Sequence, residues 1–163
     1  MPRRLLCLSG PSGAGKTTLG ELLVEALVRR GLSVAVVKHT HHPLPGDTAE
    51  SDTGRYAAAG AAAVALAGPG GLRLFLAGED PSPAVLSGLF PAVDLVLLEG
   101  YKGSDLPKVE VLPRGSPAPD PERQGIIAVV GEAVTEDRFP AFRPDELERL
   151  AGFVATWLAG SGE

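Results

Sequence analysis

The chain has 163 residues, of which 44% are hydrophobic and 21% charged, and its formal net charge is −5. We expect one domain with a substantial core over residues 1–163. The acidic balance argues against a nucleic-acid partner, because a surface that follows phosphates needs clustered cations. No apolar run suits export or reaches the roughly 18 residues of a membrane span. We therefore expect a cytoplasmic protein, with its one cysteine, Cys7, buried as a small hydrophobe.

The first predicted strand, about residues 4–9, leads into a segment that fits the phosphate-binding P-loop pattern without a mismatch. Glycines let backbone amides converge on an anion at the start of the next predicted helix, about residues 16–30. Lys16 supplies a mobile charge for the β- and γ-phosphates, and the hydroxyl of Thr17 can bind magnesium. The residues expected to hold a nucleoside triphosphate are Gly10, Ser12, Gly13, Ala14, Gly15, Lys16, Thr17 and Thr18.

The second predicted strand, residues 34–37, ends at Lys38, and a run of polar residues follows it. A cation at this strand end would face the triphosphate or an anionic partner, or it would be an ordinary solvated lysine. His39, His41 and His42 invite a metal-site interpretation, although no cysteine pair or helical histidine spacing accompanies them. Hydrogen bonding to phosphate or to a pterin-like partner is an alternative, as is an ordinary polar loop. Lys38 and His39 remain candidates for contact with the nucleotide.

Three acidic residues, Asp47, Glu50 and Asp52, lie in the loop that follows the histidines. One of them can complete a magnesium shell, and Asp52 is favoured because it stands directly before a predicted short helix at residues 52–60. The alternative for Asp52 is an N-cap of that helix without a ligand.

Glu99 closes another predicted strand, residues 95–98, and Gly100 behind it allows close approach of a ligand. A P-loop enzyme usually needs a carboxylate at the end of a second strand, to hold magnesium or to orient the attacking water. Parallel strands bring their carboxyl ends together at the ligand crevice. Asp94 opens the same strand and lies about 16 Å from Glu99, so it cannot serve the same site. We therefore assign Glu99 to magnesium or to the attacking water; a salt bridge at a strand end is the alternative.

Several apolar runs lack period-two alternation, as expected for strands buried on both faces. The sequence therefore predicts an α/β fold, a three-layer sandwich around a mostly parallel sheet of the P-loop NTPase type. The remaining expected elements are a hairpin at 62–66 and 72–77, a helix at 83–89, strands at 109–112 and 126–130, and a last helix from about residue 144 whose apolar stripe packs on the core.

The order of these motifs resembles the MobB family, the molybdopterin-guanine dinucleotide biosynthesis adapter proteins. The resemblance covers about residues 4–112 well. The motifs that carry it are the P-loop, Val-Lys-His-Thr-His-His at 37–42, Asp52-Thr53, Ala59-Gly60-Ala61, Leu98-Glu99-Gly100-Tyr101-Lys102 and Pro107-Lys108. The chain departs from the family where Gly-Lys commonly precedes the Asp-Ser/Thr pair, because Glu50-Ser51 stands there.

The resemblance implies a GTP-binding homodimer with weak magnesium-dependent GTPase activity. Such a protein would assist MobA, the nucleotidyltransferase that attaches GMP to molybdopterin cofactor. By the matched positions, residues 10–18 would hold the phosphates, Thr17 and Glu99 would serve magnesium, and Asp52 would support the metal. Lys16, Glu99 and Asp52 are thus the candidate catalytic residues. No Asn-Lys-x-Asp guanine motif is possible without asparagine, and the loop after Val130, near Gly131-Glu132, is a candidate position for the base.

Two other functions share the P-loop. A small-molecule kinase would need a lid over the phosphates, and residues 113–123 with Arg114 and Arg123 are its candidate, unless they form a plain surface loop. A nucleotide-dependent metal-insertion chaperone is the second alternative, which the three histidines motivate. Lys102 and Lys108 would form a basic rim for an anionic partner, or would keep a loop soluble.

Overall fold

The computed structural model describes residues 5–40, 51–78, 80–116, 118–119, 122–132, 134 and 138–160. The chain divides into two compact units, one made of residues 1–39 and 83–163 and the other of residues 40–82. The single domain expected over residues 1–163 stays a prediction. His41, His42, Asp47 and Glu50 lie outside the described residues, so the roles considered for them stay predictions as well.

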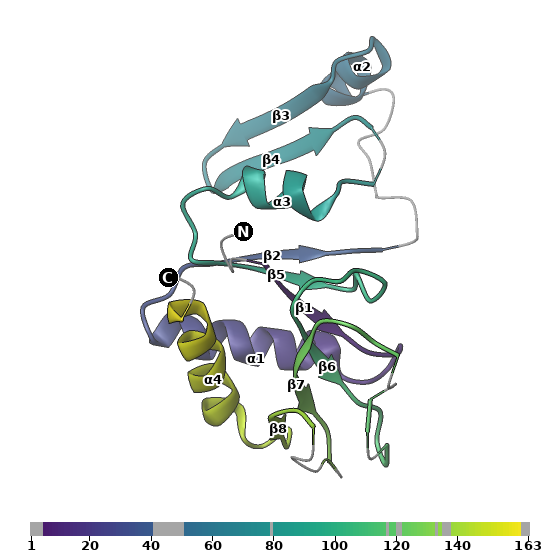
Figure 1. Ribbon diagram of the computed structural model, residues 1–163. Helices are drawn as coiled ribbons and strands as arrows, with labels where there is room; N and C mark the ends of the chain where they lie inside the picture. The colour runs from purple at the N-terminus through teal and green to yellow at the C-terminus, as the bar shows by residue number, and fades with distance from the viewer. Residues whose placement is uncertain are drawn as a thin grey trace. The chain divides into compact units, whose positions relative to one another are not determined.

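A six-stranded sheet forms the centre of the larger unit, in the order β2-β5-β1-β6-β7-β8 (Figure 1). Every neighbouring pair is parallel, so the carboxyl ends of the strands share one edge of the sheet. The sequence did not predict β8, which is too short to show a pattern. The strands are β1 (Leu5–Ser9), β2 (Val34–Lys38), β5 (Leu95–Glu99), β6 (Lys108–Val111), β7 (Ile126–Val130) and β8 (Ala141–Phe142).

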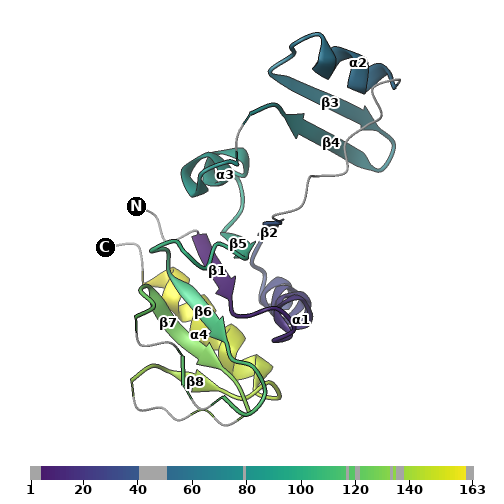
Figure 2. The same ribbon diagram turned by 90° about the vertical axis from the view of Figure 1, so that its right-hand side faces the viewer.

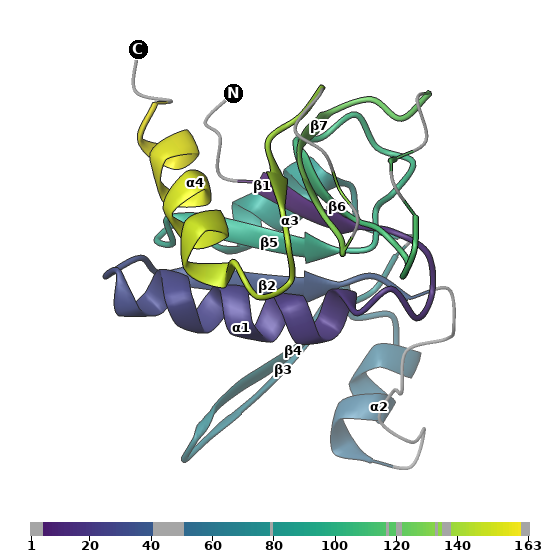
Figure 3. The ribbon, with the colours of Figure 1, turned by 90° about the horizontal axis from the view of Figure 1, so that it is seen from below.

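Helices cover both faces of this sheet. Figure 3 shows α1 (Lys16–Arg29) and α4 (Leu147–Ala159) on one face, and α3 (Pro83–Leu89) packs on the other. Within β1, Leu6 and Leu8 pack with the residues of α1 and α4, whereas Cys7 packs with Leu86 of α3. The predicted three-layer α/β sandwich is therefore confirmed. Among the described residues, no helix has the length and apolar character needed to cross a membrane.

Cys7 is fully buried, as expected for a small core hydrophobe. Burial raises the pKa of its thiol, and this effect outweighs the lowering contributions of the contact with Ser104 and of the charge of Lys108.

The last helix packs as its apolar stripe predicts, through Leu150 and Val154, which are buried against the sheet. Glu148 of the same helix pairs with Arg29 and Arg30 at the end of α1, at 2.7 and 2.6 Å. The hydrogen bond from Arg30, and then that from Arg29, holds the pKa of the Glu148 carboxyl below its ordinary value. Because the Arg29 and Glu148 side chains are 51% and 60% exposed, we expect these ion pairs to add little stability.

The smaller unit is an antiparallel hairpin preceded by a short helix (Figure 2). Its elements are α2 (Asp52–Ala58), β3 (Ala63–Gly68) and β4 (Gly71–Leu76), so the predicted hairpin is confirmed. Ser51 caps α2, since its hydroxyl accepts a hydrogen bond from the Gly54 amide at 3.0 Å.

Candidate nucleotide-binding site

Residues 10–15 join β1 to α1 through a turn that needs glycine. Gly13 and Gly15 have φ angles of 77° and 85°, in the left-handed region that other residues rarely adopt. Gly15 is the N-cap of α1 and has no side chain to cap the helix, whose first internal bond joins the Leu19 amide to the Gly15 carbonyl at 3.0 Å. The preceding amides of the first turn have no partner within the helix. This arrangement is typical of a phosphate site.

Gly10 begins the loop at a point where a side chain has no room. A Cβ atom on Gly10 would lie 2.2 Å from the carbonyl oxygen of Val111, and the φ angle of 141° is itself unfavourable for other residues. Gly10 therefore allows the loop to start directly against the end of β6.

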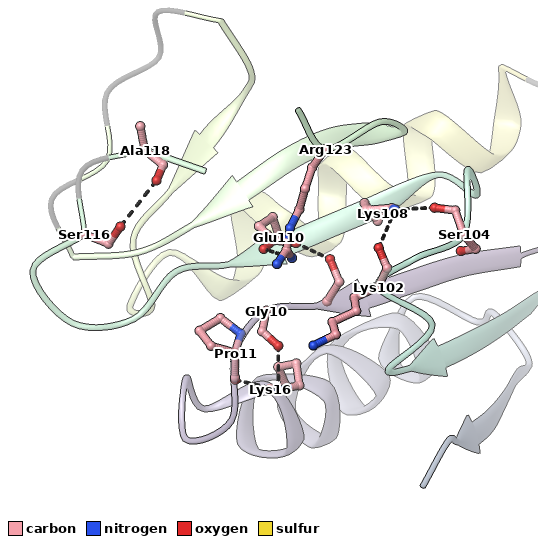
Figure 4. Close-up of polar contacts among 11 residues, drawn as sticks. Gly10, Pro11, Lys16, Lys102, Ser104, Lys108, Glu110, Ser116, Ala118 and Arg123 are labelled. Carbon is pink, nitrogen blue, oxygen red and sulfur yellow. Dashed lines mark hydrogen bonds and ion pairs between the residues drawn. The ribbon is translucent and has the colours of Figure 1, made fainter. Parts of the chain in front are cut away.

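Lys16 lies across the loop, as Figure 4 shows. Its ammonium donates hydrogen bonds to the carbonyl oxygens of Gly10 at 3.0 Å and Pro11 at 2.7 Å. These acceptors are neutral, and a charged phosphate is the stronger partner for an ammonium group. The side chain is thus already at the loop and needs little movement to contact a polyphosphate.

Three predicted site residues from separate segments meet at the carboxyl edge of the sheet. The hydroxyl of Thr17 donates to a carboxylate oxygen of Glu99 at 2.9 Å. The ammonium of Lys38 lies 3.3 Å from the same Glu99 oxygen and 3.2 Å from the Thr17 hydroxyl. Glu99 is 15% exposed, so its carboxylate is reachable from the loop side. Asp94, as expected, lies at the other end of β5, where it accepts hydrogen bonds from the amide and hydroxyl of Ser33.

His39 is held beside this cluster. Its amide donates to the Glu99 carbonyl at 2.9 Å, and its ring lies 4.7 Å from the Tyr101 ring. A Cβ atom on Gly100 would come within 3.0 Å of the His39 Cβ atom. The close approach that Gly100 permits is therefore made by His39, whereas the sequence analysis assigned it to a ligand.

Unlike the phosphate loop, which belongs to the larger of the two compact units, Asp52 belongs to the smaller one. Its side chain is 96% exposed and lies 4.0 Å from Arg55. Ser51, not Asp52, is the N-cap of α2, so the alternative role considered for Asp52 was wrong. The magnesium role of Asp52 stays a prediction. Over the described part of the chain, no three His, Cys, Asp or Glu side chains gather as a metal site.

A polar network of Ser9, Glu110 and Arg123 lies at the start of the loop, and the sequence analysis did not predict it. Glu110 of β6 is 3% exposed and accepts hydrogen bonds from the Ser9 hydroxyl and the Arg123 guanidinium (Figure 4). Ser9 is fully buried and directly precedes Gly10, so the network fixes the start of the phosphate loop. The sequence feature that could have identified this network is the alternation of charged residues and valine in Lys108-Val109-Glu110-Val111. In a strand this alternation places Lys108 and Glu110 on the same face.

Lys108 is also buried, at 1% exposure, and its ammonium donates to the carbonyl oxygens of Lys102 and Ser104. The interpretation of Lys108 as part of an exposed basic rim, or as a solubilising residue, was therefore wrong. Its function is to hold the segment that follows Glu99 against the sheet.

The two arginines of the 113–123 segment both have acidic partners. Arg123 pairs with the buried Glu110, and the Arg114 guanidinium lies 3.1 Å from the Glu132 carboxylate. A kinase lid would need such arginines over the phosphates. Because both guanidinium groups pair with carboxylates in the structure, they give the kinase alternative no support.

The parallel sheet, the glycine loop and the helix behind it define an α/β protein of the P-loop NTPase fold. The family model described as MobB, molybdopterin guanine dinucleotide synthesis protein B, matches residues 5–132. The chain belongs to this family.

Curated relatives include the molybdopterin-guanine dinucleotide biosynthesis adapter proteins of Haemophilus influenzae and Escherichia coli. Each is 33% identical to this chain and aligns with 94% of it, covering 89% and 93% of their own lengths. The crystal structure of Bacillus subtilis MobB is 29% identical, with a TM-score of 0.72, and the match covers 98% of this chain and 99% of that one.

Proposed function

We propose that this protein binds magnesium-GTP at residues 10–18, hydrolyses it slowly, and acts mainly as an adapter in molybdenum cofactor biosynthesis. The observation that carries this proposal is the contact of the Thr17 hydroxyl with the Glu99 carboxylate at 2.9 Å, at the mouth of a complete phosphate loop. Membership of the MobB family supports the pathway.

Described residues can meet each chemical requirement of the proposed site. The loop amides and Lys16 would bind the β- and γ-phosphates. The oxygens of Thr17 and Glu99 fit a hard divalent cation such as Mg²⁺, which would neutralise phosphate charge when bound. Lys38 balances the Glu99 charge in the structure, and its 60% exposed side chain leaves it able to turn toward the phosphates. Glu99 would also orient the attacking water.

We expect Glu99→Gln to retain nucleotide binding and to slow GTP hydrolysis on the order of 100-fold, a usual contribution of a positioned proton acceptor. The amide keeps the shape of the side chain but loses the charge that holds water and metal. The measurement is phosphate release under single-turnover conditions at saturating magnesium. Asp94→Asn, the same chemical change at the opposite end of β5, is the matched control and should hydrolyse at the wild-type rate. If Glu99→Gln hydrolysed GTP at the wild-type rate, the role of Glu99 would be structural only.

The proposed partner is a MobA-like nucleotidyltransferase, the enzyme that forms molybdopterin-guanine dinucleotide, in the cytoplasm where GTP is available. Immobilised protein should retain the purified transferase more strongly with magnesium-GTP than without nucleotide. If the transferase is retained under neither condition, the adapter role is contradicted. Nucleotide binding would then still have to be tested separately.

We also propose that the protein is a homodimer that pairs through the hairpin of the smaller unit. Five large apolar side chains of β3 and β4 are exposed, namely Leu66, Leu72, Leu74, Phe75 and Leu76. A hairpin of this length is marginally stable by itself and normally packs against further structure.

We expect Leu72→Ser combined with Leu74→Ser to raise the dimer dissociation constant at least about tenfold, since burying each leucine contributes about 1.5–3 kcal/mol. The two leucines point to the same face of the hairpin, because they lie two residues apart on β4. Sedimentation velocity across a concentration series measures the effect. Val28→Ser, an exposed apolar position on α1, is the control. A wild-type monomer at all concentrations would refute the dimer.

A further inference from the structure

A cavity of about 330 Å³ opens beside the phosphate loop, on the side of the sheet that carries α1. This volume lies at the low end of small-ligand sites and suits a single base better than a large cofactor. Its walls combine the loop with segments that follow two strands of the sheet. The residues concerned are Gly15 of the loop, Thr18 and Leu22 of α1, Leu112 and Arg114 after β6, and Glu132 after β7.

The inner walls of the cavity are apolar. Leu112 is 6% exposed, and Pro144 lines the same space. Leu22 stands one turn after Thr18, is 41% exposed and lines the same space. A planar aromatic ring that entered the cavity would cover part of this surface and gain hydrophobic contact.

One carboxylate marks the rim of the cavity. Glu132 is held by the Nε atom of Arg114 at 3.1 Å, and the two side chains are 52% and 88% exposed. An ion pair this exposed contributes little to stability. A carboxylate has about four acceptor positions, so Glu132 can accept further hydrogen bonds while it remains paired with Arg114.

The chemistry of this carboxylate distinguishes purine bases. Guanine presents two adjacent donors on its Watson–Crick edge, N1–H and the 2-amino group, which two carboxylate oxygens can accept together. Adenine presents one donor next to an unprotonated nitrogen, whose lone pair would face the carboxylate. A carboxylate at this position therefore favours guanine.

We infer that this cavity receives the base of the bound nucleotide and that Glu132 selects guanine, with Arg114 as its positioning residue. The inference rests on the proposed function, because the triphosphate must lie on the loop. The loop itself forms one wall of the cavity. The base of a nucleotide whose phosphates are bound to the loop would therefore lie next to this cavity. No asparagine-based guanine motif is required, which agrees with a chain that contains no asparagine.

Glu132→Gln provides the test, because an amide can accept from N1–H and can donate to an oxygen at position 2. We expect the affinity for GTP to fall on the order of tenfold, as for the loss of one bidentate base contact, and the affinity for xanthosine triphosphate to rise above that of the wild type. Calorimetric titrations with magnesium and GTP, xanthosine triphosphate, ATP or inorganic tripolyphosphate measure these affinities. Glu21→Gln, an exposed position on α1 outside the cavity wall, is the matched control.

The tripolyphosphate titration distinguishes a failure of the base site from a failure of the phosphate site. If wild-type protein and Glu132→Gln bind tripolyphosphate equally while their ratio of GTP to xanthosine triphosphate affinity reverses, the base site is supported. If both proteins bind GTP with the same ratio, the base site is refuted and the phosphate site stands. If the wild type binds neither tripolyphosphate nor GTP, the proposed function and the base site fall together.

Discussion

Lys16→Ala will reduce the affinity for magnesium-GTP by at least about 100-fold, equal to about 3 kcal/mol, while the fold is retained. In the proposed site the lysine would make charge-assisted bonds to phosphate that no other residue of the loop can replace. In the structure its ammonium donates hydrogen bonds to the carbonyls of Gly10 and Pro11, so its loss should change the unfolding free energy by about 0.5 kcal/mol or less. Calorimetric titration and circular dichroism measure the two effects.

Thermal unfolding gives an independent readout of the same variant. GTP at 100 times the wild-type dissociation constant should stabilise the wild type by about 2.7 kcal/mol. At the same GTP concentration, the unfolding free energy of Lys16→Ala should remain almost unchanged. Lys102→Ala removes a lysine from the exposed segment after β5 and should respond like the wild type. Wild-type affinity in Lys16→Ala would show that residues 10–18 are not the nucleotide site.

Glu110→Ala will destabilise the protein by about 3–5 kcal/mol, because it leaves the Arg123 guanidinium and the Ser9 hydroxyl beneath the loop without their acceptor. Urea unfolding followed by tryptophan fluorescence measures the loss. If the variant does not fold, Glu110→Gln, which keeps an acceptor oxygen, should fold with a smaller loss.

The exposed ion pair between Arg114 and Glu132 supplies the control for the buried pair between Glu110 and Arg123. Arg114→Ala removes an ion pair with Glu132 that is 88% exposed at the arginine, and it should cost less than about 1 kcal/mol. Replacing Glu110 and Arg123 together by alanine should cost less than the sum of the two single changes, since neither charge is then left alone. Additive costs, or a Glu110→Ala variant as stable as the wild type, would contradict the buried network.

The sequence was sufficient for those parts of the site that follow from a local pattern or from sheet topology. The glycine spacing predicts the turn before α1. The rule that parallel strands end at one edge predicts that Glu99 and Lys38 approach Thr17, although Glu99 is 82 positions away in the chain. The strands buried on both faces also predicted the three-layer fold, because their apolar runs lack alternation.

Other features depend on contacts that a linear pattern does not show. Charged residues are rarely buried, so Lys108 and Glu110 read as exposed until the fold places carbonyls, Ser9 and Arg123 around them. Two residues are too few for β8 to carry a periodic signal. Asp52 stands near the P-loop motifs in sequence order, yet it belongs to a different compact unit from the loop.

The loop at residues 10–18 and the carboxylate of Glu99 are proposed to form a magnesium-dependent GTP site. Calorimetric titration of the wild-type protein with GTP and with ATP, each with and without magnesium, tests it most directly. We expect GTP to bind more tightly than ATP, and we expect the binding to weaken when magnesium is removed. Equal and weak binding of both nucleotides, without an effect of magnesium, would contradict it.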